Sequence, residues 1–308
     1  RHFGKYYTNN GIFSLIKPNH IIDSKYISIK NDKIYNSSFD FLLENNEILE
    51  NKKIISISPG GYKGFYLSGV CSYIKENYDL TDYVFTGASA GAWNSLIMTY
   101  KKNTKKLIYD ILDIDTNKKS LPEIEYILKY KILKNFNTCD FDLDKLFIGL
   151  TTLDKSFRFE TNIFSNFVTL ENALDCCIAS SNIPFVTGNF STVYNNRLSF
   201  DGGFSENPYL SIKKPVLHIT PSIWSIPNKR FKLNQFNAIN DLFRKQNNPF
   251  FLYEKGYHES KINKLFLDSI FHNNDNNTSV RLNYPIDPLN DNTLSFYSNT
   301  DIIEEFVY

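Results

Sequence analysis

The sequence has no surplus of charge of either sign. Its 308 residues include 34 Lys and Arg against 33 Asp and Glu, which leaves a net charge of +1. Proteins that bind nucleic acid concentrate positive charge on the binding face. The balance therefore gives no support for nucleic acid as a partner, and we expect none.

Cysteines are few, and their spacing is uninformative. Cys71, Cys139, Cys176 and Cys177 form no Cys-x-x-Cys or Cys/His pattern. Zinc sites need such spacing, and small disulfide scaffolds need a much higher cysteine density. We therefore expect free thiols in a reducing compartment, no metal site and no cofactor.

Long apolar runs, repeats and linkers are also missing. No apolar run has the length of a membrane span, and the first residues lack the apolar segment of a signal peptide. We expect an intracellular protein, cytoplasmic or peripheral on membranes. We also expect one domain over residues 1–308, with an extension at 1–50, a core at 52–215 and a mainly helical part at 216–308.

Strands and helices alternate in the part of the chain that has the clearest pattern. The sequence predicts strands at 53–58 and 82–86, and helices at 64–78 and 90–102. A strand–helix–strand–helix order with short glycine-rich turns is typical of a parallel sheet that has helices on its faces. The expected fold class is α/β, with three α/β/α layers around a central, mostly parallel sheet.

Further elements are predicted around this unit. The insertion at 103–138, broken at Leu121-Pro122, is either a lid or a solvated connection. The remaining predictions are a strand pair at 147–153 and 156–159, a helix at 170–180, a hairpin at 192–194 and 197–200, a strand at 216–219, helical spacing over 237–271, short apolar segments at 11–16 and 26–29, and a helix at 39–49.

One turn organises the chain. Ser89 lies at the centre of Gly87-Ala88-Ser89-Ala90-Gly91, between a predicted strand and a predicted helix. Glycine flanks a serine in this way where a sharp strand-to-helix turn strains the middle residue and crowds the backbone. The hydroxyl would then be exposed at the end of a strand, over a helix N-terminus that favours developing negative charge.

Two other glycine-rich turns accompany it, at 59–64 (PGGYKG) and 201–203 (DGG). The first connects a strand to a helix and offers backbone N–H groups to an anion. The second ends a strand on a carboxylate. Because the ends of parallel strands gather at one edge of a sheet, we expect all three turns to converge there.

Such a site suits acyl transfer. Ser89 is a weak nucleophile until a base takes its proton, and Asp201 can be that base without an intervening histidine. The carboxylate must be partly desolvated, and N–H groups must stabilise the oxyanion as it forms.

These residues together resemble the patatin-like phospholipase family. The chain has PGGYKG, GASAG and DGG in the family's order, and residues 170–174 followed by 179–185 look like its helix that ends in Ala-Ser-x-x-x-Pro. A weaker match, at Gly256-Tyr257, is similar to adiponutrin-type members. The resemblance implies a lipid acyl hydrolase, of phospholipase A type or a related glycerolipid esterase, that acts through an acyl-enzyme on a phospholipid or glycerolipid.

Residue by residue, the resemblance implies Ser89 as the nucleophile and Asp201 as its base. The oxyanion hole would be formed by the backbone at Gly60, Gly61 and Lys63. The remaining motif glycines are Gly64, Gly87, Gly91, Gly202 and Gly203.

The chain departs from the family pattern at Pro59, where the first glycine is usual, and proline has no N–H to donate. This keeps open a catalytically weak or inactive lipid-binding or structural protein on the same fold. Lys63 in place of the commoner Arg is a smaller departure.

Other interpretations are weaker. A Ser-His-Asp triad would need one of His2, His20, His218, His258 or His272. The 59–64 turn lacks the spacing of a nucleotide-binding loop. The aromatic segment at 249–253 suits either a buried core helix, which we favour, or contact with a membrane or an acyl chain. Neither the need for a protein activator nor the oligomeric state follows from the sequence.

Overall fold

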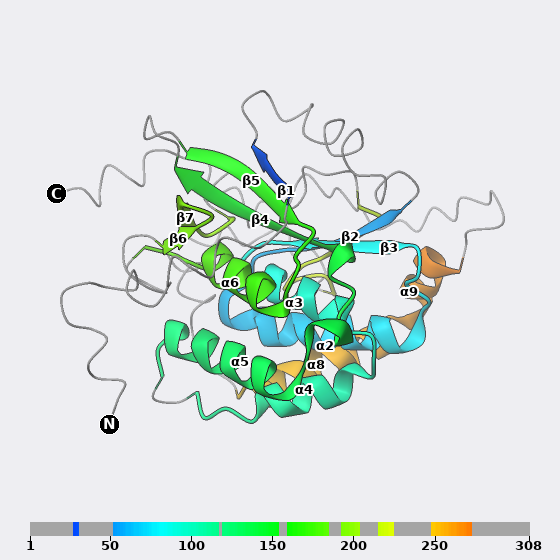
Figure 1. Ribbon diagram of the computed structural model, residues 1–308. Helices are drawn as coiled ribbons and strands as arrows, with labels where there is room; N and C mark the ends of the chain where they lie inside the picture. Colours follow the sequence, from blue (N-terminus) through cyan, green and yellow to red (C-terminus); the bar gives the residue numbers. More distant parts are fainter. Residues whose placement is uncertain are drawn as a thin grey trace, which may run out of the picture.

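The computed structural model describes residues 27–30, 52–116, 119–153, 159–184, 192–203, 215–224 and 248–272 (Figure 1). The strands are β1 (Ile27–Lys30), β2 (Lys53–Ile57), β3 (Tyr83–Gly87), β4 (Leu146–Leu153), β5 (Phe159–Ser165), β6 (Thr192–Tyr194), β7 (Arg197–Phe200) and β8 (Leu217–Ile219). The α-helices are α2 (Gly64–Asn77), α3 (Ala90–Thr99), α4 (Thr104–Leu112), α5 (Leu121–Asn135), α6 (Leu170–Ser180), α8 (Pro249–Ile262) and α9 (Lys264–Phe271).

The strands form one mixed sheet in the order β1-β5-β4-β3-β2-β8. Its centre is parallel, because β8, β2, β3 and β4 run in the same direction. β5 is antiparallel to both β1 and β4. The first half of β4 pairs with β3, and its second half pairs with β7, which runs in the opposite direction. This exchange of partners along one edge of β4 brings β3 and β7 end to end.

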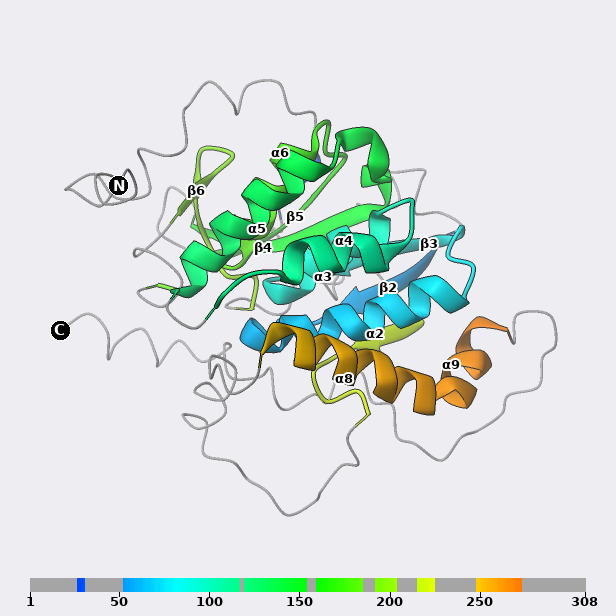
Figure 2. The ribbon, with the colours of Figure 1, turned by 90° about the horizontal axis from the view of Figure 1, so that it is seen from below.

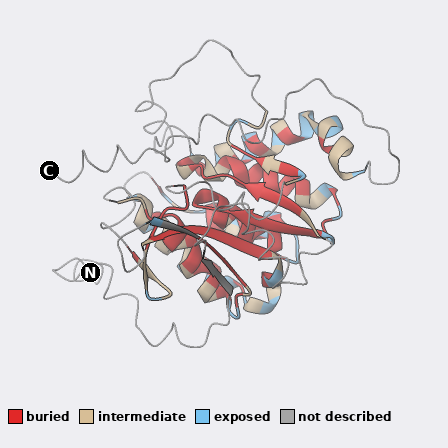
Figure 3. Ribbon diagram, turned by 90° about the horizontal axis from the view of Figure 1, so that it is seen from above, coloured by how far each residue is buried: buried red, intermediate tan, exposed pale blue. Residues whose placement is uncertain are grey.

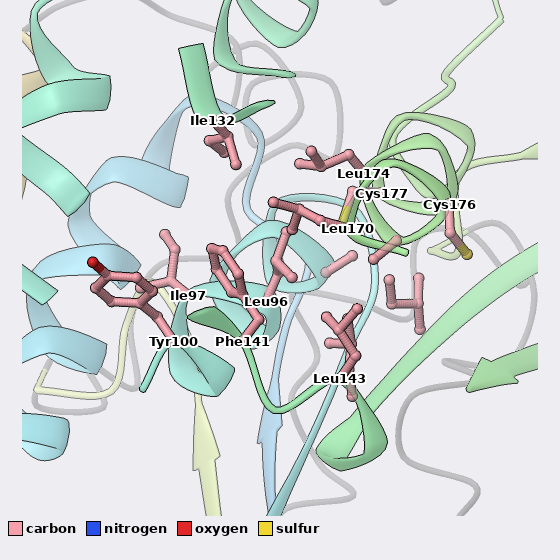
Figure 4. Close-up of a cluster of buried hydrophobic side chains, with 14 of the residues drawn as sticks. Leu96, Ile97, Tyr100, Ile132, Phe141, Leu143, Leu170, Leu174, Cys176 and Cys177 are labelled. Atoms are coloured by element: carbon pink, nitrogen blue, oxygen red, sulfur yellow. The ribbon is translucent and has the colours of Figure 1, made fainter. Parts of the chain in front are cut away.

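Apolar residues fill both faces of the sheet. Helices α2, α3 and α6 lie next to the sheet on one face, with α4 and α5 farther out, and α8 packs against α2 (Figures 1 and 2). Ile55 and Ile57 pack with α2 and α9, whereas Ile148 and Leu150 pack with α3 and α6. Figure 4 shows part of this second cluster, including Leu96 from α3 and Leu174 from α6. On β2, Ile54 alternates with these residues and is also buried, so the opposite face is covered as well (Figure 3). The α/β class with three layers and a central, mostly parallel sheet is confirmed.

Most predicted elements within the described residues are confirmed, including the helix at 170–180 and the hairpin around Asn195-Asn196. The break at Leu121-Pro122 is the start of α5, where proline occupies the first turn. The segments at 11–16 and 39–49, and residues 237–247, lie outside the described residues. The domain boundaries stay a prediction.

Two predicted boundaries were wrong. The helix after Ser89 ends at Thr99 rather than 102, because Lys101 N–H donates to the Asp140 carbonyl and leaves the helix. Of the strand predicted at 156–159, residues 156–158 lie outside the described residues, and the described strand, Phe159–Ser165, runs past the predicted end. Its polar residues concealed it, since Asn162 is buried and donates to the Thr152 hydroxyl on β4.

The aromatic segment at 249–253 begins α8. Tyr253 is buried, as expected for a core helix, but Phe250 and Phe251 are 40% and 55% exposed. None of the helices within the described ranges combines the length and apolarity needed to cross a bilayer.

Candidate active site

Ser89 occupies a strained turn between β3 and α3. Its φ of 54° and ψ of −128° lie where residues with a side chain are rare, as a nucleophile elbow requires. Gly91 makes this turn fit, because a Cβ there would lie 2.0 Å from the Ile57 carbonyl oxygen. The sequence prediction of a sharp strand–Ser89–helix turn is therefore confirmed.

Ser180 holds this turn from α6. Its Oγ accepts a hydrogen bond from the Ser89 N–H at 2.8 Å and donates to the Gly149 carbonyl at 2.7 Å. Its carbonyl accepts from the Gly202 N–H at 3.1 Å. Ser180 thus ties together both site turns and β4, a role that sequence reasoning missed although the residue lies in a recognised motif.

Asp201 reaches Ser89 by a route other than the expected one. It follows β7, whose last residue, Phe200, lies opposite Thr151 on β4, whereas Gly87 at the end of β3 lies opposite Ile148. The two strands run in opposite directions along the same edge of β4, so their carboxyl ends meet head to head. The three turns converge, but the 201–203 turn arrives on an antiparallel strand rather than at the common edge of parallel strands.

Gly202 and Gly203 allow this meeting. A Cβ at Gly202 would lie 2.4 Å from the Gly149 carbonyl oxygen and 2.6 Å from the Ala88 Cβ. The Gly203 N–H donates to Asp201 Oδ1 at 2.7 Å and so fixes the carboxylate.

The Asp201 carboxyl is desolvated. The residue is 2% exposed, and its Oδ2 has no hydrogen-bond partner among the described residues. Burial raises the pKa of Asp201 to about 6, while the Ser89 hydroxyl and the Gly203 N–H act to lower it. Ser89 is thus near enough to influence the carboxyl, although no well-formed hydrogen bond joins it to Oδ2. This is the environment that a carboxylate base requires.

The 59–64 turn lies beside Ser89 at the start of α2. Gly61 has a φ of 51°, which favours glycine. The Lys63 N–H donates to the Gly60 carbonyl at 3.0 Å, so the expected contribution of the Lys63 backbone to an oxyanion hole is not supported by this arrangement. Within the described ranges, the N–H groups of Gly60 and Gly61 have no acceptor.

The helix starts at this site are closely packed. A Cβ at Gly64 would approach the Ala90 Cβ to 2.9 Å, so glycine lets α2 and α3 begin side by side. The Ala90 N–H directly follows Ser89 at the start of α3, a backbone donor that sequence reasoning did not consider.

A cavity of about 100 Å³ opens beside Ser89. Its wall comes from α2, α3, α4 and α5, so the insertion at 103–138 covers the site rather than forming a solvated connection. The lining is largely apolar, and includes Phe65, Trp93, Leu96, Ile97, Leu107, Ile111, Leu121, Ile124, Leu128 and Ile132. An apolar lining of this kind suits a hydrocarbon chain.

Neither a triad nor a metal site is apparent in the described part of the chain. His258 and His272 are exposed, His218 belongs to β8, and none of the three lines the cavity. Sequence reasoning placed His2 and His20 among the candidates, and both lie outside the described residues. No group of three His, Cys, Asp or Glu residues able to hold a metal occurs within the described ranges.

Comparison with known protein families gives a match. The family model described as patatin-like phospholipase matches residues 55–212, a stretch that contains the 59–64 turn, Ser89 and Asp201. No curated protein matches the chain significantly.

Proposed function

This chain belongs to the patatin-like phospholipase family, whose members hydrolyse lipid esters, and on that premise we propose that it cleaves an acyl ester of a phospholipid or another glycerolipid through a Ser89–Asp201 dyad. One observation carries the proposal. The strained Ser89 meets a buried carboxyl with an unpaired oxygen, at the mouth of an apolar cavity.

In the first half-reaction, Ser89 Oγ attacks the ester carbonyl carbon while its proton passes to Asp201. The carbonyl oxygen becomes an oxyanion, and the N–H groups of Gly60, Gly61 and Ala90 are its proposed donors. When the carbon–oxygen bond to the alcohol breaks, the leaving alkoxide takes the proton from Asp201. An acyl-Ser89 ester remains, with its chain in the cavity.

In the second half-reaction, Asp201 accepts a proton from water, and the resulting nucleophile attacks the acyl-enzyme. Collapse of that intermediate releases the fatty acid and returns the proton to Ser89. No metal or cofactor enters either half-reaction.

The test is release of fatty acid from phospholipids, lysophospholipids and triacylglycerol. Wild type should release fatty acid from at least one of them, and Ser89→Ala and Asp201→Asn should each reduce the rate about a thousandfold or more. Ser269→Ala, on the distant helix α9, is the matched control and should retain the wild-type rate. Full activity in either dyad variant would contradict the mechanism.

The second candidate function is that of a lipid-binding protein without activity. Pro59 motivates it, because proline has no N–H to donate to an oxyanion. Gly60 and Gly61 retain theirs, which favours the hydrolase. Binding of lipid without release of fatty acid, even in the presence of cell extract, would favour the second candidate.

We further propose peripheral contact with the lipid surface. Tyr109 on α4 and Phe250 on α8 have ring centroids 5.4 Å apart, and both are exposed together with Phe251. Helix α4 also lines the cavity through Leu107. Phe250→Ser with Phe251→Ser should weaken sedimentation with phosphatidylcholine vesicles, and unchanged sedimentation would exclude this surface.

A further inference from the structure

One carboxyl group lines the cavity and has no part in the dyad mechanism. Glu125, on α5, lies among apolar side chains such as Ile124 and Leu128. Glu125 is half-buried and lines the cavity, and its carboxyl is desolvated. A charged carboxylate on the wall of an apolar cavity is unfavourable unless it is paired. The ionisation state of Glu125 therefore affects the binding of any acyl chain that enters the cavity.

Hydrogen-bond capacity around Glu125 favours the neutral acid. The Trp93 indole N–H donates to Ser181 Oγ at 3.2 Å, and the Ser181 hydroxyl donates to the Cys177 carbonyl at 3.0 Å. Both donors are therefore shared with other acceptors, and their hydrogen bonds to Glu125 offset its desolvation only in part.

The charges that face Glu125 act in the same direction. Burial raises the pKa of Glu125 well above its ordinary range, and the negative charge of Asp201 raises it further. The Ser181 hydroxyl and the Trp93 indole oppose this only in part. Cys177, which faces Glu125 from α6, has its own pKa raised by burial and by Glu125, so it adds no charge.

No cation compensates within the described residues. Lys129, one turn farther along α5, lies 2.5 Å from Asp175 and 3.5 Å from Glu171, both on α6. The positive charge of Lys129 is therefore paired with carboxylates of α6 and not with Glu125. Two carboxyl groups near the site, Asp201 and Glu125, are thus driven to different protonation states, the first available as a base and the second neutral.

We propose that Glu125 controls acyl binding: as a neutral acid it forms the polar part of the wall along which an uncharged acyl chain lies, and its ionisation excludes that chain. The inference rests on the proposed function. It predicts that ionisation of Glu125 weakens chain binding and leaves the chemistry of the dyad intact. KM should then change, and kcat should not.

The kinetic test compares wild type, Glu125→Gln and Glu123→Gln on p-nitrophenyl octanoate between pH 6 and 10, with the Ser89→Ala rate subtracted. Glutamine keeps the shape of the side chain but cannot ionise. Glu123 lies on the same helix, is exposed and caps its start, so its variant is the matched control. Wild type and Glu123→Gln should show KM rising about tenfold or more at the alkaline end, and Glu125→Gln should show no such rise. Parallel KM profiles for wild type and Glu125→Gln would overturn the inference.

Glu125→Met provides a second variant, because its unbranched apolar side chain fills the same space. Thermal unfolding of each variant identifies any that does not fold. A Met variant that folds and still shows the alkaline rise in KM would also contradict the role of Glu125.

A binding measurement separates this inference from the proposed function. Ser89→Ala should bind a neutral pyrene-labelled monoacylglycerol more weakly as pH rises, and Ser89→Ala with Glu125→Gln should not. If wild type hydrolyses no ester but this difference is found, the function fails and the role of Glu125 stands. If ester hydrolysis is found but neither KM nor binding depends on Glu125, the proposed function stands and the role of Glu125 fails.

Discussion

At the residue scale, the burial that makes Asp201 a usable base also lowers the stability of the fold. Its folded-state pKa of about 6 lies above the ordinary 3.8. The folded chain therefore binds this proton more tightly than the unfolded chain, and stability falls as pH rises from about 4 to 6. Above pH 6 the full cost of a buried carboxylate is present, up to about 3 kcal/mol at 1.36 kcal/mol per pKa unit.

The first prediction is that Asp201→Asn abolishes activity and stabilises the protein. The amide keeps an acceptor for the Gly203 N–H and carries no charge, so at pH 8 the variant should unfold at a higher temperature than wild type. The difference should shrink as pH falls to 4, where wild type is protonated. In wild type, kcat/KM should rise with pH through about 6, because the ionised form is the base. Thermal unfolding and rate profiles against pH measure both effects, and a variant less stable than wild type at pH 8 would contradict the prediction.

The second prediction concerns Ser180. Ser180→Ala leaves the Ser89 N–H and the Gly149 carbonyl without their side-chain partner in a buried position. We expect a loss of about 1–3 kcal/mol in unfolding free energy, together with a lower kcat because Ser89 is no longer held in its turn. Urea unfolding and ester hydrolysis test this, with Ser269→Ala as the control. Wild-type kcat in a folded Ser180→Ala variant would show that the Ser89 turn keeps its conformation without the Ser180 hydrogen bonds.

At the scale of elements, the crossing of α2 and α8 depends on two glycines. A Cβ at Gly69 would lie 2.0 Å from the Tyr253 carbonyl oxygen, and one at Gly256 would lie 2.1 Å from that of Tyr66. The Gly256-Tyr257 segment, whose pattern weakly resembles adiponutrin-type members, thus serves in helix packing here.

The third prediction is that Gly256→Ala destabilises the protein. Alanine favours a helix over glycine by about 1 kcal/mol, yet overpacking the crossing should cost more, for a net loss of about 1–3 kcal/mol. Lys255→Ala, on the exposed side of the same turn, should change stability little. Urea unfolding measures the stability of both variants. A Gly256→Ala variant more stable than wild type would show that α2 and α8 can move apart without a loss of packing energy.

Local elements could be predicted from the sequence, but their long-range pairing could not. The turn at Ser89 follows from neighbouring glycines and a short β-branched strand, so it was predicted correctly. The antiparallel arrival of Asp201 depends on β7 pairing with the second half of β4, and no local pattern specifies that pairing. The Lys63 N–H donates to the Gly60 carbonyl, and this hydrogen bond depends on a backbone geometry that the sequence pattern does not specify. Glu125 was missed because spacing along α5 does not reveal which side faces the cavity.

At the scale of the whole molecule, the chain has no disulfide among its four cysteines. Cys71, Cys176 and Cys177 are buried, and burial raises the pKa of each thiol, whereas Cys139 is exposed. Only an accessible thiol that forms thiolate reacts readily.

The fourth prediction follows from this distribution. One thiol per chain should react with Ellman's reagent in the native protein, and four should react after unfolding in guanidinium. Cys139→Ser should leave no fast native reaction. More than one fast native thiol would mean that the packing around α6 or α2 opens readily.

The most direct test of the central claim is the identity of the residue that becomes acylated. Wild type is treated with a long-chain fluorophosphonate at pH 8, and the adduct is mapped by mass spectrometry of its peptides. We predict a single adduct on Ser89, none in Ser89→Ala and strongly slowed labelling in Asp201→Asn. An adduct on another residue, or fatty acid release by a wild type whose Ser89 stays unlabelled, would contradict this prediction.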